Sequence, residues 1–328
     1  MPRIPLSFSP AVADALAADR DLRVVLAGGR GWLGRAALEM LEGALGDDIA
    51  SRVAVFGSSN GRVELASGRA LPTRQLPALA ELPPGRCLFL HFSFLTKDKV
   101  VDRPLSAFVE ANAAISATIE AQARRLRPLG VVMPSSGAAT QTGGGFESNP
   151  YGFMKLADEA RFTRLGEELG FGFSGPRLFN LAGPFINKTD SYVLACIIRD
   201  VQAGRPIRLQ ADKPVIRSYV HVRDLLDVCV ADLLLHPGSG PPVFETAGES
   251  EIEIGELARR IAQVLGRPET GIVRPALDPA RPADRYVGDS EEWRARMRRH
   301  GIAAAPLDRQ IRDTADYLLE AGLRPVVG

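Results

Sequence analysis

The sequence predicts an α/β fold, in which a doubly wound parallel sheet is followed by a smaller, mixed α/β lobe toward the C-terminal end. Short apolar, β-branched runs alternate with longer segments of helical periodicity in the first half of the chain. A glycine-rich turn follows the first of these runs, and the alternation loses its regularity after Pro184. Strands that alternate with helices form parallel sheets joined by right-handed crossovers, so we expect the first half to carry the main sheet.

The elements of the first half follow in order. Leu22–Ala27 is an apolar run that ends at the glycines, and we predict it to be the first, buried strand. Between residues 62 and 85, the Pro and Gly residues leave room for at most a short strand. The other predicted strands are 52–56, 87–92, 129–133 and 171–177, and the predicted helices are 32–45, 104–127 and 151–169.

After Pro184 the predicted elements are shorter and mixed. Strands are expected at 207–210, 218–222, 243–246 and 272–274, and helices at 192–203, 224–235, 254–265 and 307–320. A chain of 328 residues is too long for one small core, so an appended lobe is expected. We divide the chain into an N-terminal extension (1–21), the main sheet domain (22–184) and a lobe (185–328) that returns some strands to the main sheet.

Composition and charge narrow the class of protein. The formal charge is +1, from 40 basic and 39 acidic residues, which gives no electrostatic basis for binding nucleic acid or a membrane surface. The first twenty residues lack the pattern of a secretory signal, and no apolar run is long enough to span a bilayer. The three cysteines are few and widely spaced, which favours buried thiols in a reducing compartment: Cys87, Cys196 and Cys229. We expect a cytoplasmic protein with no metal site, since the four histidines have no clustered carboxylates.

The turn after the first predicted strand has the spacing Gly28-x-x-Gly31-x-x-Gly34, with Trp32 and Leu33 inside it. Glycines at these positions allow a tight turn and a close approach of the backbone to phosphate, while the following helix N-terminus favours negative charge. At the first strand-to-helix turn, this pattern predicts a Rossmann-type dinucleotide site.

The second predicted strand indicates which dinucleotide is preferred. An acidic residue at its end would hold the ribose hydroxyls of NAD, but Phe56 is followed by Gly57, Ser58, Ser59 and Asn60. Arg30 lies within the glycine loop and Arg62 just beyond the serines, and both would attract a 2′-phosphate. The sequence therefore favours NADP(H), with NAD(H) as the alternative.

Tyr151 and Lys155 share one face of a predicted helix, one turn apart. The lysine charge favours the phenolate and lowers the tyrosine pKa, so this tyrosine suits proton transfer near neutral pH. Upstream, Ser136 ends a predicted strand, where its hydroxyl could hydrogen-bond a substrate carbonyl oxygen. Together with the glycine loop, these residues predict hydride chemistry, with Ser136, Tyr151 and Lys155 as the catalytic group.

From about Leu22 to Tyr317, the chain resembles the extended short-chain dehydrogenase/reductase family of nucleotide-sugar epimerases, dehydratases and reductases. The resemblance is carried by the glycine loop, the Ser136, Tyr151 and Lys155 set, and the segments 91–94, 110–112, 177–184, 217–224 and 281–284. It implies that Arg217 and Arg281 grip a substrate phosphate, and that helices 104–127 and 151–169 form a homodimer. Residues and resemblance together assign the cofactor to Gly28, Arg30, Gly31, Trp32, Leu33, Gly34, Ser58, Ser59, Arg62, His91, Phe92, Ser93, Asn112, Tyr151, Lys155 and Phe179, and the substrate to Ser136, Asn180, Arg217 and Arg281.

Three departures from the family pattern narrow the reaction. Residues 137–140 contain no carboxylate, where 4,6-dehydratases place an Asp-Glu pair, so sugar dehydration is disfavoured. Phe185 stands where the fucose-synthase branch has an acid/base histidine, and Gly137 replaces its cysteine, so C3/C5 epimerisation is disfavoured too. The segment from Ser136 to Tyr151, with Gly143–Gly145, is shorter than is usual for sugar-nucleotide enzymes, which leaves a non-sugar ketone open as the substrate. Separately, Phe92 and Phe94 replace residues that are usually small in the family.

The leading hypothesis is an NADP(H)-dependent reductase that acts on a keto group, the 4-keto group of a nucleotide-activated sugar. Net reduction draws on a pool of free NADPH, whereas a C4-epimerase retains its cofactor between two opposite hydride transfers. The C4-epimerase is the first alternative. A small-ketone reductase and a non-catalytic regulator that senses dinucleotides remain as further alternatives.

Overall fold

A computed structural model describes residues 6–96 and 104–322 of the chain. Within these residues the central sheet has nine strands, eight of them in the order β13-β8-β6-β5-β1-β2-β4-β3, with β7 paired to β8. Neighbouring strands are parallel except for β3 and β4. The strands are β1 Arg23–Ala27, β2 Val53–Gly57, β3 Gly61–Glu64, β4 Ala70–Gln75, β5 Cys87–His91, β6 Gly130–Val132, β7 Ser135–Ser136, β8 Gly172–Leu178 and β13 Val243–Glu245.

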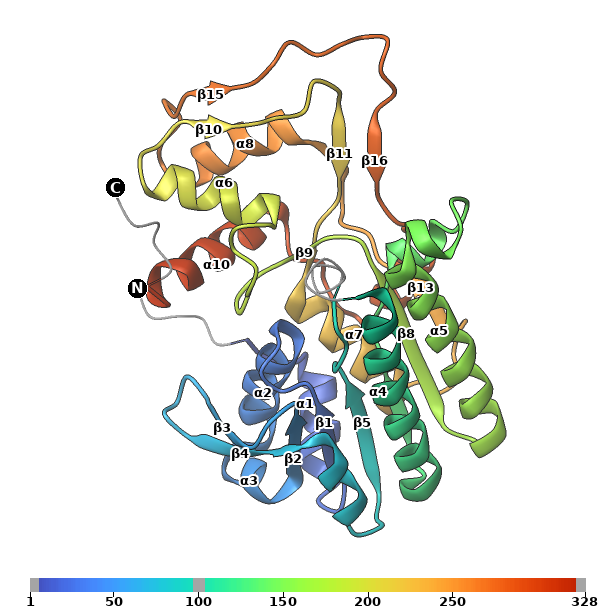
Figure 1. Cartoon of the computed structure of the whole chain (residues 1–328). Coiled ribbons are helices and arrows are strands. Elements are labelled where there is room, and N and C mark those ends of the chain that lie inside the picture. The colour runs from blue at the N-terminus through green and yellow to red at the C-terminus, as the bar shows by residue number, and fades with distance from the viewer. Residues whose placement is uncertain (1–5, 97–103, 323–328) are drawn as a thin grey trace.

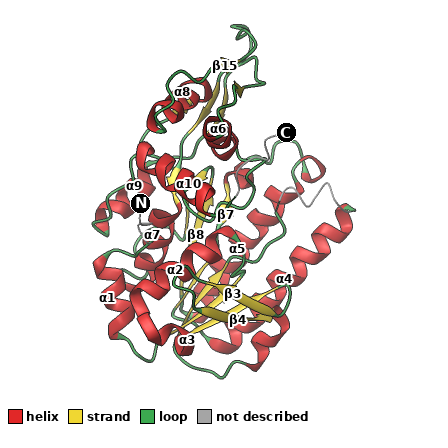
Figure 2. Cartoon of the chain, turned by 90° about the vertical axis from the view of Figure 1, so that its left-hand side faces the viewer, coloured by secondary structure: helices red, strands yellow, loops and turns green. Residues whose placement is uncertain are grey.

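Helices cover both faces of this sheet (Figures 1 and 2). Alternate residues of β1 point to opposite faces: Val24 and Leu26 belong to one buried cluster and Val25 to another. The first cluster includes side chains of α1 Pro10–Ala18, α2 Trp32–Leu45 and α7 Val222–Leu234. The second includes side chains of α4 Leu105–Leu126, α5 Pro150–Leu169 and the 3₁₀ helix η2 Leu76–Glu81. The predicted doubly wound α/β fold is therefore confirmed.

The second lobe lies above the carboxyl ends of the main strands in Figure 1. Its helices are α6 Val193–Gln202, α8 Ile254–Val264 and α10 Leu307–Glu320, and α9 Glu291–Arg299 lies near β13. Its short strands are β10 Ile207–Arg208, β11 Val215–Arg217, β14 Ile252–Glu253, β15 Ile272–Val273 and β16 Asp284–Tyr286. A further pair, β9 Leu181–Ala182 and β12 Val220–His221, joins the lobe to the main body. The predicted mixed lobe is present, and β13 pairs with β8 of the main sheet.

Several predicted elements need correction. At most one short strand was predicted in residues 62–85, but β3 and β4 form a hairpin over residues 61–75. The hairpin lies at the edge of the sheet and half of its strand residues are exposed, so it lacks the apolar pattern of a buried strand. The strand predicted at 218–222 is wrong, since Val222 starts α7 and only Val220 and His221 form a strand. No element was expected at α9, β14 or β16, which are short and carry few apolar residues.

The N-terminal extension contains α1, which packs against α2 and α7. The Ser9 amide and hydroxyl both donate to the Asp227 carboxylate of α7, at 2.9 Å each. The Arg52 guanidinium, at the end of α3 Ile49–Arg52, donates to the carbonyls of Leu16 and Asp19 at 2.8 and 2.7 Å. This part of the extension is therefore built into the body.

Within the described residues, no helix is long and apolar enough to cross a membrane. The same residues contain no group of three or more His, Cys, Asp or Glu side chains that could hold a metal ion.

Candidate active site

The glycine loop follows β1, which lies between β2 and β5 in the sheet. Doubly wound sheets bind ligands in the crevice at the carboxyl ends of such central strands. Gly28 has φ +96°, and a Cβ there would lie 2.6 Å from the carbonyl carbon of Phe92. A Cβ at Gly34 would lie 2.2 Å from the Gly28 oxygen, so α2 and the loop touch backbone to backbone. Gly31 has open space on its Cβ side, apart from one oxygen at 3.4 Å. These residues fit the close backbone approach that a pyrophosphate needs.

The N-terminus of α2 points into this loop. Its N-cap is Gly31, and among the described residues no side chain caps its amides. Unpaired amides and the helix dipole favour an anion at this position. Trp32 and Leu33 form the first turn of α2 and are buried or half-buried there, so they support the loop with packed side chains.

Arg30 lies across the loop that follows β2. Its guanidinium donates to the Ser59 hydroxyl at 2.8 Å and to the Asn60 carbonyl at 3.2 Å. Ser58 lies beside them, and residues 57–60 include no carboxylate. Arg62 is exposed two residues further, in β3. The structure thus brings Arg30 and Ser59 together in one polar cluster with a positive charge.

Tyr151 and Lys155 belong to the first turns of α5, whose N-cap is Asn149. The Asn149 side-chain oxygen accepts a hydrogen bond from the Gly152 amide at 3.0 Å. Its side-chain nitrogen donates to the carbonyls of Ala138 and Gln141, at 2.8 Å each. Asn149 therefore fixes the start of α5 to the segment that follows Ser136. Sequence analysis missed this residue, although Asn before Pro150 is a typical helix start.

Lys155 is buried, with only 6% of its surface exposed, and its ammonium donates to the Pro134 carbonyl at 2.9 Å. Burial lowers the pKa of Lys155 to about 8, while the carboxylates of Asp158 and Glu159 oppose this effect. The ring of Phe94 lies over the ammonium, with its centroid 3.9 Å from Nζ. The pKa of Lys155 therefore lies close to neutral pH.

Ser136 is buried, and its hydroxyl accepts a hydrogen bond from the Ala138 amide at 3.2 Å. The Tyr286 hydroxyl of β16 hydrogen-bonds this serine and the Ala138 backbone, while burial raises the pKa of Tyr286. The Phe179 ring packs on Tyr286 at 4.9 Å, and a Cβ at Gly137 would lie 2.5 Å from Phe179. Tyr286 is therefore a site residue that sequence analysis missed, because β16 shows no strand periodicity.

A partly buried ion pair joins α5 to β8. The Arg177 guanidinium donates twice to the Glu159 carboxylate, at 3.0 and 2.7 Å, and the Ser135 hydroxyl donates to the same carboxylate. Ser135 precedes Ser136 in β7, and Glu159 follows Lys155 by one turn of α5. This network holds β7, β8 and α5 in register around the catalytic group.

His91 and Asn112 are buried near Lys155 and near the loop after β5, respectively. His91 is 2% exposed, and burial together with the Lys155 charge lowers its pKa to about 3, so it is neutral at physiological pH. Asn112 of α4 accepts from the Leu95 amide at 2.8 Å and donates to the Leu95 carbonyl at 3.3 Å. Asn112 thus fixes the loop that contains Phe92, Ser93 and Phe94 after β5.

The candidate substrate residues lie at the junction with the second lobe. Asn180 donates to the carbonyls of Ser218 and Tyr286, at 3.2 Å each. Arg217 donates to the Asp284 carbonyl and carboxylate at 2.9 and 3.3 Å, and its guanidinium carbon lies 5.9 Å from the Tyr286 ring centroid. Arg281 is about half exposed and pairs with Asp212 at 2.5 Å. Each of the two guanidinium groups thus has its own carboxylate partner in this conformation.

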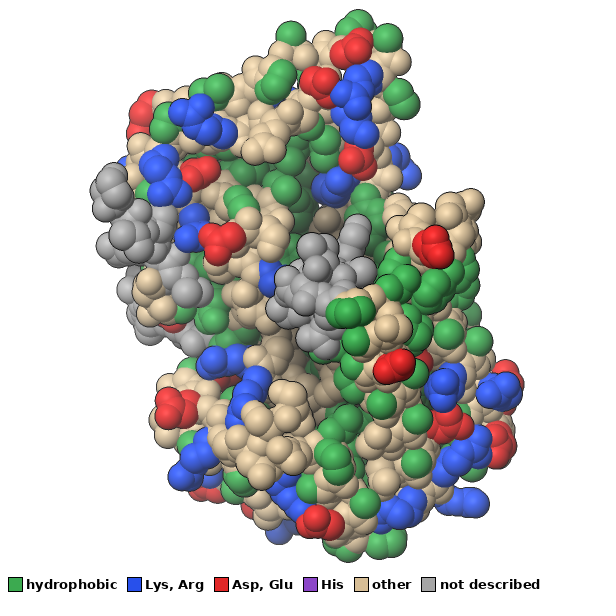
Figure 3. Space-filling model, in the orientation of Figure 1, with side chains coloured by type: hydrophobic (Ala, Val, Ile, Leu, Met, Phe, Trp, Pro, Cys, Tyr) green, Lys and Arg blue, Asp and Glu red, His purple; other side chains and the backbone are tan. Residues whose placement is uncertain are grey.

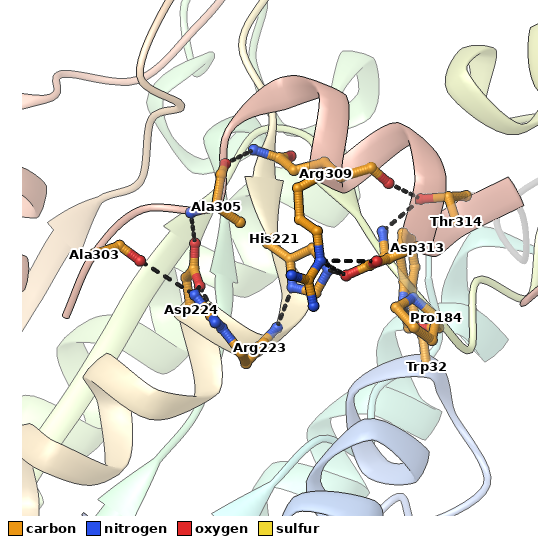
Figure 4. A network of polar contacts seen from close by, with 12 residues as sticks. Trp32, Pro184, His221, Arg223, Asp224, Ala303, Ala305, Arg309, Asp313 and Thr314 are labelled. Atoms are coloured by element: carbon orange, nitrogen blue, oxygen red, sulfur yellow. Dashed lines mark hydrogen bonds and ion pairs between the residues drawn. The ribbon is translucent and has the colours of Figure 1, made fainter. Parts of the chain in front are cut away.

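A polar network ties the glycine-loop helix to the second lobe (Figure 4). The Trp32 indole donates to the Pro184 carbonyl at 2.7 Å, and the Gly183 amide donates to the Thr314 hydroxyl of α10 at 2.8 Å. His221 lies 3.3 Å from the Asp313 carboxylate of the same helix. Phe185, which follows Pro184, is buried, so its place is filled by a packed ring.

Comparison with known proteins agrees with this geometry. The profile of the NAD dependent epimerase/dehydratase family matches residues 24–243. A dTDP-4-dehydro-6-deoxy-D-allose reductase of Streptomyces bikiniensis is 32% identical over 139 residues, which make up 42% of this chain and 40% of that protein. The chain thus matches well under half the length of this curated relative.

Two solved structures share the fold over nearly the whole chain. One is UDP-N-acetylglucosamine 4-epimerase of Methanobrevibacter ruminantium M1 in complex with UDP-N-acetylmuramic acid, with 17% identity, 92% of this chain and 99% of that chain covered, and a TM-score of 0.70. The other is UDP-glucose 4-epimerase of Thermus thermophilus in complex with NAD, with 22% identity, coverages of 91% and 99%, and a TM-score of 0.65. Because the family profile matches from β1 to β13, more than half of the sequence, this chain belongs to the NAD dependent epimerase/dehydratase family.

Proposed function

We propose that this protein is an NADP(H)-dependent reductase of the 4-keto group of a nucleotide-activated sugar. The observation that carries the proposal is that α5, which holds Tyr151 and Lys155, packs on the segment that begins at Ser136, while a glycine loop that fits a pyrophosphate follows β1. The reductase of Streptomyces bikiniensis supports the reaction class, since its name describes the reduction of a keto sugar nucleotide.

The cofactor preference rests on Arg30. Its guanidinium donates to Ser59 and Asn60, in the loop after β2. An enzyme that prefers NAD usually has a carboxylate in this loop, which binds the free ribose hydroxyls, and residues 57–60 contain none. A 2′-phosphate there would receive charge-assisted hydrogen bonds from Arg30 and a hydroxyl donor from Ser58 or Ser59. Gly28, Gly31 and Gly34 would hold the pyrophosphate, and the bound cofactor would supply the hydride. NAD(H) is the alternative cofactor, since the related Thermus thermophilus enzyme was solved with NAD.

In this scheme, a tyrosine of α5 supplies the proton for the reduction. Tyr151 donates it to the substrate oxygen as negative charge develops there, and the Lys155 ammonium favours the phenolate that remains. The Ser136 hydroxyl hydrogen-bonds the same oxygen and holds it in place. His91 takes no part in proton transfer in this scheme, because its pKa lies at about 3.

The substrate diphosphate would lie near the junction of the two lobes. Arg217 supports this, because it lies beside Tyr286, which itself contacts Ser136. Arg281 would join it only after it releases Asp212. Residues 137–140 provide no carboxylate for dehydration, as the sequence indicates.

A nucleotide-sugar C4-epimerase is the second candidate, and the names of both solved relatives favour it. A reductase consumes one NADPH for each product molecule, whereas an epimerase interconverts two sugars with no net change in its cofactor. A small-ketone reductase and a dinucleotide-sensing regulator fit the same fold with less support, because neither explains Arg217 and the complete catalytic group together.

The deciding experiment mixes the purified protein with NADPH or NADH and a nucleotide-bound 4-keto sugar. We expect loss of the reduced-nicotinamide absorbance, faster with NADPH, and a reduced sugar nucleotide as the product. Tyr151→Phe is the control for non-enzymatic loss. Interconversion of two sugar nucleotides without consumption of NADPH would instead assign the epimerase activity.

We also propose a cytoplasmic homodimer that associates through α4 and α5. Hydrophobic side chains gather on the α5 side of the face shown in Figure 3. Leu156 of α5 and Phe146, which lies shortly before α5 in the chain, are exposed. An apolar surface of this kind marks a candidate protein interface. Light scattering of the purified protein measures the oligomeric state directly.

A further inference from the structure

Phe94 contacts both members of the candidate proton-transfer pair. Its ring centroid lies 3.9 Å from Lys155 Nζ, and 5.8 Å from the Tyr151 ring centroid with an interplanar angle of 79°. The first distance is within the range of cation–π attraction, and the second arrangement is edge-to-face. One ring therefore touches the ammonium and the phenol at once, at a position where the family pattern has a small residue.

The Lys155 ammonium has few other partners. It carries three N–H donors, and the part of the chain that the structure describes provides one acceptor, the Pro134 carbonyl at 2.9 Å. The side chain is almost fully buried, and burial disfavours its charged form. The negative face of the Phe94 ring compensates for part of this loss of solvation.

The charged groups around Lys155 are engaged elsewhere. On α5, the Asp158 carboxylate accepts a hydrogen bond from a serine of α4, and Glu159 is paired with Arg177 of β8. His91 of β5 is neutral, and the positive charge of Lys155 is one cause of its low pKa. The two carboxylates attract the ammonium through space, but neither is hydrogen-bonded to it in the described contacts. Phe94 is the group that lies directly on it.

The loop that carries Phe94 is itself fixed. Asn112 of α4 holds the neighbouring Leu95 by two backbone hydrogen bonds, at 2.8 and 3.3 Å. This buried asparagine thus fixes the backbone next to Phe94, whose ring lies against Lys155 and Tyr151 of α5.

We propose that Phe94 is a positioning residue, whose ring holds the Lys155 ammonium and the Tyr151 phenol in the arrangement that proton transfer requires. It acts through these two side chains and forms no bond to a reacting atom. Its effect on turnover rests on the proposed function, whereas its effect on Lys155 does not. The two are therefore measured separately.

The direct test follows the titration of Lys155 by NMR in protein labelled at the lysine side chains. The chain contains five lysines, so the signals are few, and Lys155→Met identifies the relevant one. Phe94→Leu keeps an apolar side chain but removes the ring face. We expect it to raise the acid dissociation constant of Lys155 by about two- to thirty-fold, the range that a cation–π contact of ordinary strength gives.

Two controls isolate the ring. Phe94→Tyr retains an aromatic face and should titrate like the wild type. Phe146→Leu makes the same change at an exposed ring that packs on Phe153 instead of Lys155, and should also leave the titration unchanged. If Phe94→Leu does not fold, Phe94→Met carries the same expectation. An unchanged or lower dissociation constant in the ring-free variant overturns the proposal.

The kinetic test separates this inference from the proposed function. In Phe94→Leu, the alkaline limb of keto reduction should move to lower pH, with the KM for NADPH unchanged, because less Lys155 is protonated at a given pH. A shifted titration in a protein that reduces no keto sugar nucleotide would support the role of Phe94 and refute the proposed reaction. A shifted titration with an unmoved pH profile in an active enzyme would refute the positioning role.

Discussion

Tyr151 and Lys155 lie one turn apart on α5, and their surroundings come from neighbours in sequence and from residues far along the chain. Pro134 accepts from the lysine, Phe94 lies over it, and Asn149 fixes the helix start. The pair and Ser136 could be predicted from spacing and residue type. Phe94 and Tyr286 could not be assigned a role, because their contacts depend on how two loops and a short strand fold back on the site.

Tyr151→Phe is expected to lower the rate of keto reduction by about 10²–10⁴-fold, the usual effect of losing a positioned general acid. Binding of NADP(H) should remain close to that of the wild type, because the ring and the Lys155 contacts are retained. Steady-state kinetics and calorimetric titration measure the two effects. A variant with most of its kcat would remove Tyr151 from the mechanism.

Arg30 controls the choice of cofactor if the cluster around Ser59 holds a 2′-phosphate. We expect NADP(H) to bind at least ten-fold more tightly than NAD(H), which corresponds to about 1.4 kcal/mol. Arg30→Ala should abolish most of this preference with little change in the affinity for NAD(H). Calorimetric titration with both cofactors measures it, and equal affinities in the wild type would contradict the assignment.

His91 should make folding stability sensitive to acid. Its pKa is lowered from 6.5 to about 3 by burial and by Lys155, so between these values the unfolded chain binds a proton that the folded protein does not. Stability contributed by the neutral histidine is therefore lost as the pH falls below about 6.5. Between pH 6.5 and 5, the free energy of unfolding of the wild type should fall by roughly 2 kcal/mol more than that of His91→Gln. Urea unfolding at both pH values measures the difference; parallel curves would show that His91 is not buried in its neutral form.

At the scale of elements, strands buried on both faces were the easiest to predict. β1 and β5 are mostly apolar, buried runs, and each appears within one residue of its predicted bounds. The edge hairpin β3–β4, with Pro72 in it, and the three-residue β16 lack such a signal. α9 was missed for a different reason: its sequence is mostly charged, and only one side of it, with Trp293 and Met297, is buried.

The N-terminal extension, for which no element was predicted, contains helix α1. Leu16 of α1 is fully buried among side chains of the main body. Leu16→Ala should therefore destabilise the protein by about 2–5 kcal/mol, the range for a buried leucine. Asp14→Ala, at an exposed position of the same helix, is the matched control and should change stability by less than about 0.5 kcal/mol. Urea unfolding measures both, and an equal, small effect would mean that α1 detaches in solution.

At the scale of the whole molecule, the candidate catalytic residues lie near contacts between the two lobes. β16 brings Tyr286 onto Ser136, Phe179 packs against Tyr286, and Trp32 holds the Pro184 carbonyl at the point where the chain enters the second lobe. Sequence patterns predicted both lobes but not these contacts, since each joins residues more than 40 positions apart. The substrate would bind where the contacts meet.

Substitution of Arg217 and of Arg281 tests how the second lobe would recognise its substrate. Arg217 lies beside Tyr286, whereas Arg281 is more exposed and paired with Asp212. If Arg217 holds a diphosphate, its charge-assisted contact contributes about 1.5–3 kcal/mol, and Arg217→Ala should raise KM by about ten- to hundred-fold. A truncated substrate without the diphosphate should show little of this effect. Arg281→Ala, the same change at the paired site, should raise KM comparably only if Arg281 leaves Asp212 when the substrate binds. Steady-state kinetics with both substrates decides between one phosphate-binding arginine and two, and an unchanged KM in Arg217→Ala would favour a small ketone in place of the nucleotide-bound sugar.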